Sequence, residues 1–187
     1  MTAPHVRYRL RKVLRYVEHV LATMGMLFLL CHIFLQVGPI VSSSMSPALN
    51  GPEKGPQDWT VAERLSTWLR QPRRWEIVSF YNTEGLMVAK RVVALPGEEV
   101  SIVDGLVCIN GRPLAPPPNL SYLKYVAAGR VRPGHSVQCA IDEFFVLGDE
   151  TLDSYDSRYE GPIRRQQILS RTVLRIWPRD RIAWLVP

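Results

Sequence analysis

The stretch that decides the fold runs from Leu86 to Leu114 and reads LMVAKRVVALPGEEVSIVDGLVCINGRPL. It consists of short runs rich in β-branched residues, separated by Pro-Gly, Asp-Gly and Asn-Gly pairs. β-Branched runs favour strands, and these pairs favour turns. The stretch therefore predicts consecutive short strands, with Asp104-Gly105 at the end of a hairpin and an exposed strand after it.

The same pattern continues on both sides of this stretch. EIVSFYN (residues 76–82) precedes it, and a proline-bounded loop, LAPPPNL, ends it. SYLKYVAAGRVRPGHSVQCAI (121–141) and DEFFVLGD (142–149) are expected to supply further strands. Only IRRQQILSRTVLRIW (163–177) is ambiguous, since it has the pattern of a helical turn at its start and of a strand at its end. The sequence predicts a mainly β, mostly antiparallel domain.

A long apolar run without formal charge precedes this domain. Residues 20–41 read VLATMGMLFLLCHIFLQVGPIV, interrupted only by His32 and Gln36. At about 1.5 Å per residue, a helix of this length spans a hydrocarbon core of about 30 Å. The alternatives are a buried core helix and a cleaved signal peptide, but apolar residues surround the whole helix and no Ala-x-Ala site follows it. We predict one transmembrane signal-anchor helix over residues 17–41.

Basic residues are concentrated before this helix. Five of the positive charges behind the formal net charge of +6 lie in the first sixteen residues, at Arg7, Arg9, Arg11, Lys12 and Arg15. The rest of the chain is close to neutral, which argues against a nucleic-acid-binding domain, and such an arm suits an anionic cytoplasmic leaflet at least as well as DNA. By the positive-inside rule, we expect the arm (residues 1–16) in the cytoplasm and the domain (residues 42–187) outside it.

Residues 50–74 differ in character from both neighbours. They open with the turn-rich NGPEKGPQD and continue as WTVAERLSTWLRQPRR, where Gln71-Pro72 ends the pattern. The residues that fall on one helical face are Val61, Leu65, Trp68 and Leu69. We therefore expect an amphipathic insert with a short helix, which either lies in the membrane interface or packs on the domain.

The three cysteines do not form a metal-binding pattern. Cys31 lies in the apolar run, and Cys108 and Cys139 are widely separated, without CxxC spacing. Two interpretations stay open for Cys108 and Cys139: a disulfide in an extracytoplasmic domain, or isolated buried thiols, which we favour. We expect neither a metal nor a cofactor.

A domain without metal ligands needs its own nucleophile. Three of the four histidines lie in the arm or the apolar run, and His135 lies in a PGH turn, so none is well placed for a Ser-His-Asp triad. A lysine held neutral by burial is the other base that activates a serine. Beyond the arm, only Lys90 stands inside an apolar strand pattern, where burial costs free energy. The serines just past the helix, at positions 42–44 and 46, are candidate nucleophiles or simply a polar exit from the bilayer.

Three blocks behind the apolar helix carry a resemblance to a known family. Residues 44–47 read Ser-Met-Ser-Pro, residues 90–98 read KRVVALPGE, and residues 148–158 read GDETLDSYDSR. In this order they resemble the Ser-Met-x-Pro, Lys-Arg and Gly-Asp…Ser-x-Asp-Ser-Arg boxes of the type I signal peptidases. Bacterial leader peptidases and mitochondrial inner-membrane peptidases belong to this family. The resemblance implies a β domain of signal-peptidase type behind a single N-terminal transmembrane helix.

The chain departs from the family pattern at four places. The insert separates the first two boxes, and Trp75-Glu76 stands where Gly-Asp is usual. Ala94 replaces a common glycine, and Glu150 replaces a common asparagine. None of these changes removes a residue of the implied catalytic dyad, so they affect the expected geometry of the substrate loops more than the expected chemistry.

The resemblance implies a serine protease mechanism. Ser44 is the implied nucleophile and Lys90 the implied general base, which must be neutral to accept a proton. The backbone N–H of Ser44 and the hydroxyl of Ser42 are the implied oxyanion hole.

Three further residues have implied supporting roles. Ser154 is expected to orient the amine of Lys90. Asp156 and Arg158 are expected to form an ion pair beneath the site, and a plain surface salt bridge is the alternative for these two residues.

The implied activity is cleavage of signal peptides after small residues of Ala-x-Ala type. The expected partners are signal-peptide-bearing preproteins, the lipid bilayer and the secretion translocon, with no nucleic acid. The expected location is the bacterial plasma membrane, with the mitochondrial inner membrane as the alternative. The rival interpretations are a catalytically inactive membrane-anchored binding or scaffold protein and a self-cleaving repressor, although a repressor carries a DNA-binding domain where this chain has an apolar helix.

Overall fold

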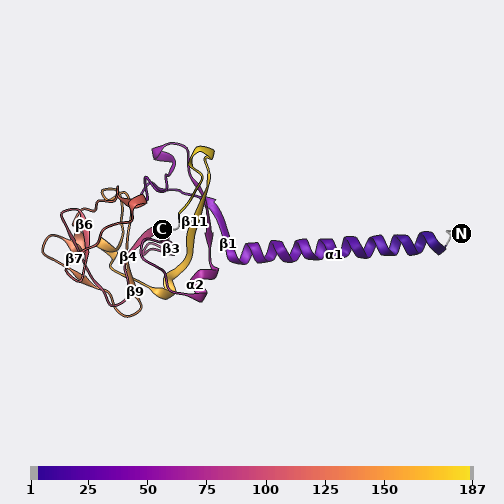
Figure 1. The fold of residues 1–187 in the computed structure, drawn as a ribbon, viewed down its shortest axis with the longest axis horizontal. Coiled ribbons are helices and arrows are strands. Elements are labelled where there is room, and N and C mark those ends of the chain that lie inside the picture. Colours follow the sequence, from indigo (N-terminus) through magenta and orange to yellow (C-terminus); the bar gives the residue numbers. More distant parts are fainter. Residues whose placement is uncertain (1–3, 186–187) are drawn as a thin grey trace. The chain divides into compact units, whose positions relative to one another are not determined.

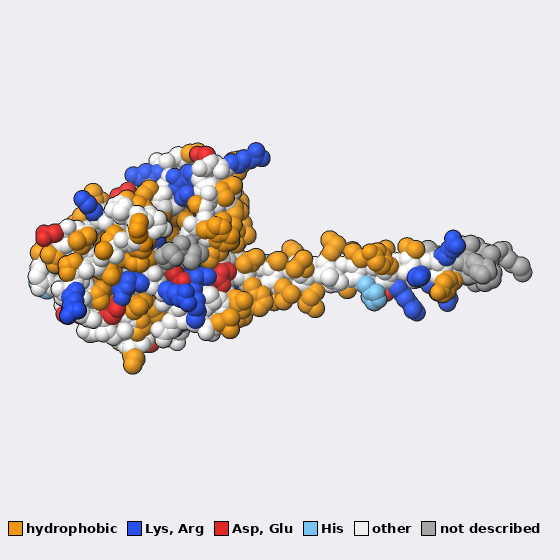
Figure 2. All heavy atoms as spheres, in the orientation of Figure 1, with side chains coloured by type: hydrophobic (Ala, Val, Ile, Leu, Met, Phe, Trp, Pro, Cys, Tyr) orange, Lys and Arg blue, Asp and Glu red, His pale blue; other side chains and the backbone are white. Residues whose placement is uncertain are grey.

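The computed structural model describes residues 4–185. The chain divides into two units, residues 1–35 and residues 36–187. The first unit is a single helix, α1 (Pro4–Phe34), drawn as the long coiled ribbon in Figure 1. Its Arg11–Phe34 part is long and apolar enough to cross a membrane, with a mean hydropathy of 1.7. Figure 2 shows hydrophobic side chains along this helix and basic side chains toward its N-terminal end.

The boundaries expected for the span and the arm need correction. The helix ends at Phe34 and not at Val41, because the following residues form strand β1 (Leu35–Pro39), which pairs with another strand. A proline and a glycine near the end of the apolar run make helix there unfavourable. The described part of the basic arm is helical and continuous with the span, so the arm is not a separate segment.

The second unit contains two sheets. The larger has eight strands in the order β1-β2-β11-β3-β4-β9-β10, with β12 paired to β11; the smaller has four, in the order β7-β6-β5-β8. The larger sheet contains, besides β1, the strands β2 (Trp59–Glu63), β3 (Ile77–Tyr81), β4 (Met87–Ala94), β9 (Glu143–Leu147), β10 (Ile163–Arg164), β11 (Ile168–Trp177) and β12 (Ala183–Trp184). The smaller contains β5 (Glu99–Val103), β6 (Leu106–Ile109), β7 (Arg112–Pro113) and β8 (Val137–Gln138).

Short helical elements complete the second unit. They are the α-helices α2 (Leu65–Leu69) and α3 (Ser157–Glu160) and the 3₁₀ turns η1 (Pro52–Lys54), η2 (Pro118–Leu120), η3 (Gly129–Val131), η4 (Arg165–Gln167) and η5 (Arg179–Arg181). The prediction of a mainly β, antiparallel domain is confirmed. Residues 163–177 combine a helical turn, η4, with the long strand β11, as their mixed pattern indicated.

The short helix expected in the insert is confirmed as α2, but it is shorter than the pattern indicated. Trp59–Glu63, which includes Val61, is a strand that pairs with β11. Thr60 and Ala62 are buried while Trp59 is 42% exposed, a period of two that the helical reading overlooked. The insert is therefore part of the large sheet.

The strand expected at the start of residues 121–141 is also wrong. This segment is irregular as far as the short strand β8, apart from η3. Its buried side chains, Leu123, Tyr125 and Val131, pack into the main core beside the small sheet. Apolar residues here fill a core without a strand partner, so the apolar pattern alone was misleading.

The cysteines are free thiols. Cys108 and Cys139 are both buried, which confirms the interpretation as isolated thiols. Burial raises the pKa of Cys139 to about 12, so this thiol is protonated at physiological pH.

Candidate active site

The loop after β1, residues 42–49, carries the candidate nucleophile, and we call it the serine loop. Two of its apolar side chains, Met45 and Leu49, are buried and pack with Ile77 of β3. Its backbone is closed by hydrogen bonds from Leu49 N to Met45 O at 2.8 Å and from Ser46 N to Ser43 O at 2.9 Å. These anchors fix the loop against the sheet and leave Ser44 half-buried at its surface.

Strand β4 presents Lys90 to this loop. Lys90 is only 2% exposed, and its Nζ lies 2.6 Å from Oγ of Ser44. The two residues are far apart in sequence, and the sheet brings them into hydrogen-bonding contact. This is the distance that direct proton transfer between a nucleophile and its base requires.

The surroundings of Lys90 favour its neutral form. Burial lowers its pKa from 10.5 to about 8, and the charge of Arg158 acts in the same direction. The carboxylates of Asp156, Asp149 and Glu160 oppose this shift, but none of them forms an ion pair with Lys90 within the described part of the chain. Lys90 is therefore deprotonated in a substantial fraction of molecules at mildly alkaline pH.

The remaining hydroxyl of the predicted oxyanion hole lies beside the nucleophile. Oγ of Ser42 is 3.3 Å from Oγ of Ser44. The backbone of Ser42 is in close contact with Gly51, where an added Cβ would lie 2.6 Å from the Ser42 carbonyl carbon. Because that approach requires a glycine, the turn-rich start of the insert helps to position the serine loop.

A second contact holds the serine loop on the insert side. Oγ of Ser43 donates to Oε2 of Glu53 at 2.7 Å, and this hydrogen bond is the main cause that lowers the pKa of Glu53. Lys54 lies 3.7 Å from Glu150, whose backbone N–H donates to Ser44 O at 3.1 Å. Glu150, which departs from the family pattern, thus supports the nucleophile through its backbone.

The predicted supporting residues form a buried network beside the dyad. Ser154, Asp156 and Arg158 are all less than 10% exposed. The Arg158 guanidinium donates to both Asp156 oxygens at 2.9 Å, so the expected ion pair is present and it is buried, not at the surface. The hydroxyl of Ser154 donates to Asp156 Oδ2 at 2.9 Å, and among residues 4–185 it forms no hydrogen bond with Lys90.

Gly148 shows how close this network lies to the nucleophile. A Cβ at this position would lie 2.1 Å from Oγ of Ser154 and 2.5 Å from Ser44 O. Its backbone N–H donates to Asp156 Oδ2 at 2.9 Å. The Gly-Asp block therefore needs its glycine so that β9, the serine loop and the Asp156 network can meet.

A second buried ion pair, which was not predicted from the sequence, lies next to the dyad. Arg91, the neighbour of Lys90 on β4, donates from Nε and Nη2 to the two oxygens of Asp149, at 2.7 and 2.6 Å. The hydroxyl of Tyr122 donates to the same carboxylate at 3.1 Å. The available signal was an arginine inside an apolar strand together with an aspartate at the end of another, since a buried charge needs a partner.

A cavity of about 410 Å³ opens beside the dyad, and we call it the substrate groove. One wall is the segment from Gly38 to Ser44, and the other is the start of β4 from Met87 to Ala89. Its floor comes from small side chains of the sheet: Thr60, Ala62, Ser79 and Thr172. The groove is mainly apolar, and Ser42 and Ser44 line it together with the sheet.

The start of β4 has a free edge along this groove. Met87, Val88 and Ala89 pair with β3 on one side. On the other side, β9 pairs only from Arg91 onward, so residues 87–89 have no strand partner there among residues 4–185. Unpaired N–H and C=O groups at such an edge are able to bind an extended peptide as an added strand.

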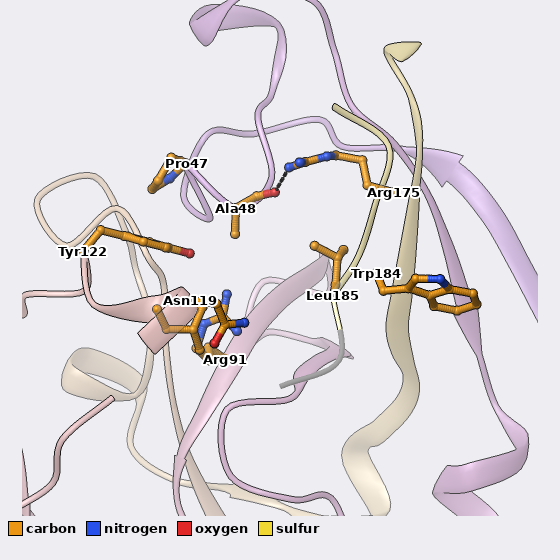
Figure 3. A pocket seen from close by; sticks show the side chains of 9 residues that line it. Pro47, Ala48, Arg91, Asn119, Tyr122, Arg175, Trp184 and Leu185 are labelled. Carbon is orange, nitrogen blue, oxygen red and sulfur yellow. Dashed lines mark hydrogen bonds between the residues drawn. The ribbon is translucent and has the colours of Figure 1, made fainter. Parts of the chain in front are cut away.

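A separate cavity of about 290 Å³ lies on the other side of the serine loop (Figure 3). Pro47 and Ala48 of the loop face Tyr122 and Arg91 across it, and Arg175 lies beside Ala48. A dashed line in Figure 3 marks the hydrogen bond from Arg175 to the Ala48 carbonyl. Arg91 donates to Asp149 and to the Trp75 carbonyl. Arg175 therefore holds the serine loop from this cavity, whereas Arg91 is engaged elsewhere.

Residues 4–185 contain no group of three or more histidine, cysteine, aspartate or glutamate side chains able to hold a metal ion. The arrangement that the site does contain, a serine hydroxyl bonded to a buried amine beside an apolar groove, is suited to acyl transfer.

Known proteins of one family are similar to this chain. The model of the family described as signal peptidase, peptidase S26, matches residues 13–177. The probable signal peptidase I-2 of Synechocystis sp. is 36% identical over 153 residues, which cover 78% of this chain and 65% of that protein. The signal peptidase I of Leptolyngbya laminosa is 35% identical over 157 residues, which cover 79% of this chain and 71% of that protein.

One solved structure is also similar. The crystal structure of a signal peptidase I from Enterococcus faecalis has a TM-score of 0.46 and 28% identity, over 55% of this chain and 97% of that chain. Against the first of the curated relatives, the chain spans just under two thirds of the full length.

Proposed function

The chain belongs to the signal peptidase family, peptidase S26, and from this premise we propose that it is a membrane-anchored serine endopeptidase that removes N-terminal signal peptides from exported preproteins. We assign the nucleophile to Ser44 and the general base to Lys90. The observation that carries the proposal is the 2.6 Å contact between Nζ of a buried lysine and Oγ of this serine.

The proposed reaction begins with neutral Lys90. Its amine accepts the hydroxyl proton of Ser44 while Oγ attacks the scissile carbonyl carbon, and the carbonyl electron pair moves onto the oxygen. The Ser44 N–H and the Ser42 hydroxyl donate to that oxyanion. The Lys90 ammonium then gives its proton to the leaving amine as the C–N bond breaks.

The acyl-enzyme is released by the same groups. Lys90 takes a proton from a water molecule, whose oxygen attacks the ester carbonyl carbon, and the proton returns to Ser44 as the ester bond breaks. We assign Ser154 a positioning role toward the amine, and Asp156 and Arg158 the role of a buried frame beneath it. The contact between Ser154 and Asp156 at 2.9 Å supports the membership of Ser154 in this frame.

The proposed specificity is for small residues before the cut. The substrate adds as a strand along the free edge of Met87–Ala89, and its side chains enter the substrate groove. Ala62, Ser79 and Thr172 line the mainly apolar groove, which suits small apolar side chains such as that of alanine.

The proposed location is the bacterial plasma membrane, with the mitochondrial inner membrane as the alternative. The apolar part of α1 supports anchoring, and the basic residues before it support a cytoplasmic N-terminus. This orientation places the β domain outside the cytoplasm, where preproteins emerge. The proposed partners are these preproteins, the bilayer and the secretion translocon.

The test is cleavage of a preprotein with an Ala-x-Ala site by the detergent-solubilised chain. We expect Ser44→Ala and Lys90→Ala to lose activity by about a thousandfold or more. Matched controls are Ser46→Ala in the same loop and Lys124→Ala at an exposed position, which should retain activity. Full activity of a folded Ser44→Ala protein would exclude the dyad. A wild type inert on all substrates would favour the inactive binding or scaffold protein.

A further inference from the structure

A second cavity adjoins the substrate groove near α2, and we call it the α2 pocket. It has a volume of about 650 Å³, and Met87 lines both this pocket and the groove. In the pairing of β3 with β4, Ser79 lies opposite Ala89 and Tyr81 opposite Met87. Because alternate side chains share a face, the α2 pocket lies over the same face as the groove, one step farther from Lys90.

The α2 pocket is lined by two arginines without carboxylate partners. Neither Arg64 nor Arg165 forms an ion pair with any of residues 4–185. Nε of Arg64 is buried and has no hydrogen-bond partner in this part of the chain. Within residues 4–185, the side chain of Arg165 donates only to the backbone carbonyls of Thr67 and Arg70. Asp142 also lines the pocket, but the two arginines outnumber this one carboxylate, so the lining carries a net positive charge.

The surroundings of Arg165 do not compensate its charge. Burial lowers the pKa of Arg165 because it disfavours the charged form, and the nearby positive charge of Arg70 lowers this pKa further. The carboxylates of Glu63 and Glu76 already form other ion pairs. Arg171 pairs with both of them, and Arg70 also pairs with Glu76. A ligand with a negative charge would therefore relieve the uncompensated charge of Arg64 and Arg165.

The walls of the pocket are apolar. Trp68 of α2, Tyr81 of β3 and Ile168 of β11 line it beside the arginines, and α2 packs against β11 (Figure 1). An apolar wall next to guanidinium groups suits a short aliphatic stem that ends in a carboxylate, as in glutamate. A bare phosphate would leave this wall unused.

We infer that the α2 pocket is a further substrate subsite, which binds an acidic side chain several residues before the cleaved bond. This inference rests on the proposed function, in which the residues next to the cut pair with Met87–Ala89. At about 3.3 Å per residue, a chain that continues past Met87 reaches Arg64 and Arg165 with the residue about five to seven positions before the cut. The pocket then selects among substrates by charge.

The test uses a preprotein series that differs at one position, with glutamate, glutamine or lysine placed in turn at the fifth, sixth and seventh residues before the cut. We expect the wild type to cleave the best glutamate substrate about fivefold to tenfold faster in kcat/KM than its lysine counterpart. Arg64→Glu should reverse this order, because the lysine substrate then regains a partner. The matched control is Arg112→Glu on β7, an exposed arginine of the small sheet, which should keep the wild-type order.

A binding measurement separates this inference from the proposed function. The same series is titrated against Ser44→Ala, which keeps the groove and the α2 pocket. Preference for glutamate in binding, without cleavage by the wild type, would retain the subsite and reject the proposed function. Cleavage that is indifferent to charge at all three positions would reject the subsite and retain the proposed function.

One further outcome points to a different occupant. If Arg64→Glu lowers cleavage only in vesicles that contain anionic phospholipid, equally for all substrates, the pocket binds a lipid headgroup and the inference is wrong. Arg165→Glu is the second variant. Since Arg165 also holds α2 through backbone carbonyls, the informative result for it is rescue by the lysine substrate.

Discussion

Lys90 and Arg91 are neighbours on β4, are equally buried at 2% exposure, and yet have opposite electrostatic surroundings. Burial lowers the pKa of both, but for Arg91 the hydrogen bonds and charge of Asp149 outweigh it, and the pKa is raised. Lys90 has no such partner, and its pKa falls to about 8. Burial therefore lowers the pKa of a cation in this strand only where no carboxylate is paired with it.

The two side chains also face different parts of the molecule. Lys90 reaches Ser44 beside the substrate groove, whereas Arg91 lies behind the serine loop with Tyr122 (Figure 3). Adjacent positions of one strand point to opposite faces, so β4 separates a cation free to lose its proton from a cation held charged. The first suits chemistry and the second suits stability.

The largest expected effect is on activity, and it comes from replacing Lys90 by arginine, the residue type at position 91. Lys90→Arg keeps the positive charge but removes the ability to act as a base, since a guanidinium does not deprotonate in proteins. We expect kcat to fall by about a thousandfold or more, measured on the preprotein substrate. Lys90→Met, which removes the charge altogether, serves as the comparison. Appreciable activity in Lys90→Arg would show that a cation, and not a base, is what Ser44 requires.

The next effect is on stability and concerns Arg91. Asp149→Asn removes the charge that compensates this buried guanidinium, and breaking such a pair costs about 3–5 kcal/mol. The free energy of unfolding by urea, measured on detergent-solubilised protein, should fall accordingly. The matched control is Glu98→Gln, which breaks the more exposed ion pair with Arg74 and should cost about 1 kcal/mol or less. Equal losses in the two variants would contradict the assignment of Asp149 as the essential partner.

The sequence predicted the role of Lys90 in this comparison, but it did not predict the ion pair of Arg91. A lysine in the apolar pattern of residues 86–95 singled out Lys90, and its identification with Ser44 came from the resemblance of three blocks in order. The strands β3, β4 and β9 were predicted because their apolar runs are bounded by turn residues. Arg91 was overlooked because an arginine next to Lys90 looks like part of the family motif, and because its partner Asp149 follows another strand.

The two wrong predictions of secondary structure have a common physical cause. Thr60 and Ala62 lie in a strand because β11 supplies backbone partners, which a local helical pattern does not reveal. In the opposite sense, Leu123 and Tyr125 are apolar and buried without any strand. Tertiary contacts decided both segments, and such contacts are not encoded in local periodicity.

A third prediction concerns pH. If Lys90 acts as the base, kcat/KM should rise with pH with a midpoint near pH 8, as the amine loses its proton. A flat profile from pH 6.5 to 9.5 would contradict a base with this pKa. We expect Lys90→Met to retain too little activity for a pH profile, so the ionisation of Lys90 is also followed through the free energy of unfolding.

The same ionisation links Lys90 to stability. Because the pKa is about 8 in the folded chain and 10.5 in the unfolded one, the unfolded chain holds more protons between these values. The free energy of unfolding of the wild type, relative to Lys90→Met, should therefore rise as pH increases from 8 to 10.5, by about 3 kcal/mol at most. Below pH 8 the amine is protonated in both the folded and the unfolded chain. The difference in the free energy of unfolding between the wild type and Lys90→Met should therefore be constant there. A difference that stays constant over the whole range would mean that burial does not perturb Lys90.

The smallest expected effect tests whether the two sides of β4 are independent. Tyr122→Phe removes the hydroxyl that donates to Asp149, at a cost of about 1 kcal/mol in the free energy of unfolding. Burial, followed by the charge of Asp149, raises the pKa of Tyr122 to about 12, so the lost group is uncharged at neutral pH. Its removal should leave both kcat/KM and the pH midpoint unchanged, because no charge near Lys90 is altered. A shift of the midpoint would instead mean that Asp149, once freed from Tyr122, changes its interaction with Lys90 across the strand, and the separation between chemistry and stability would not hold.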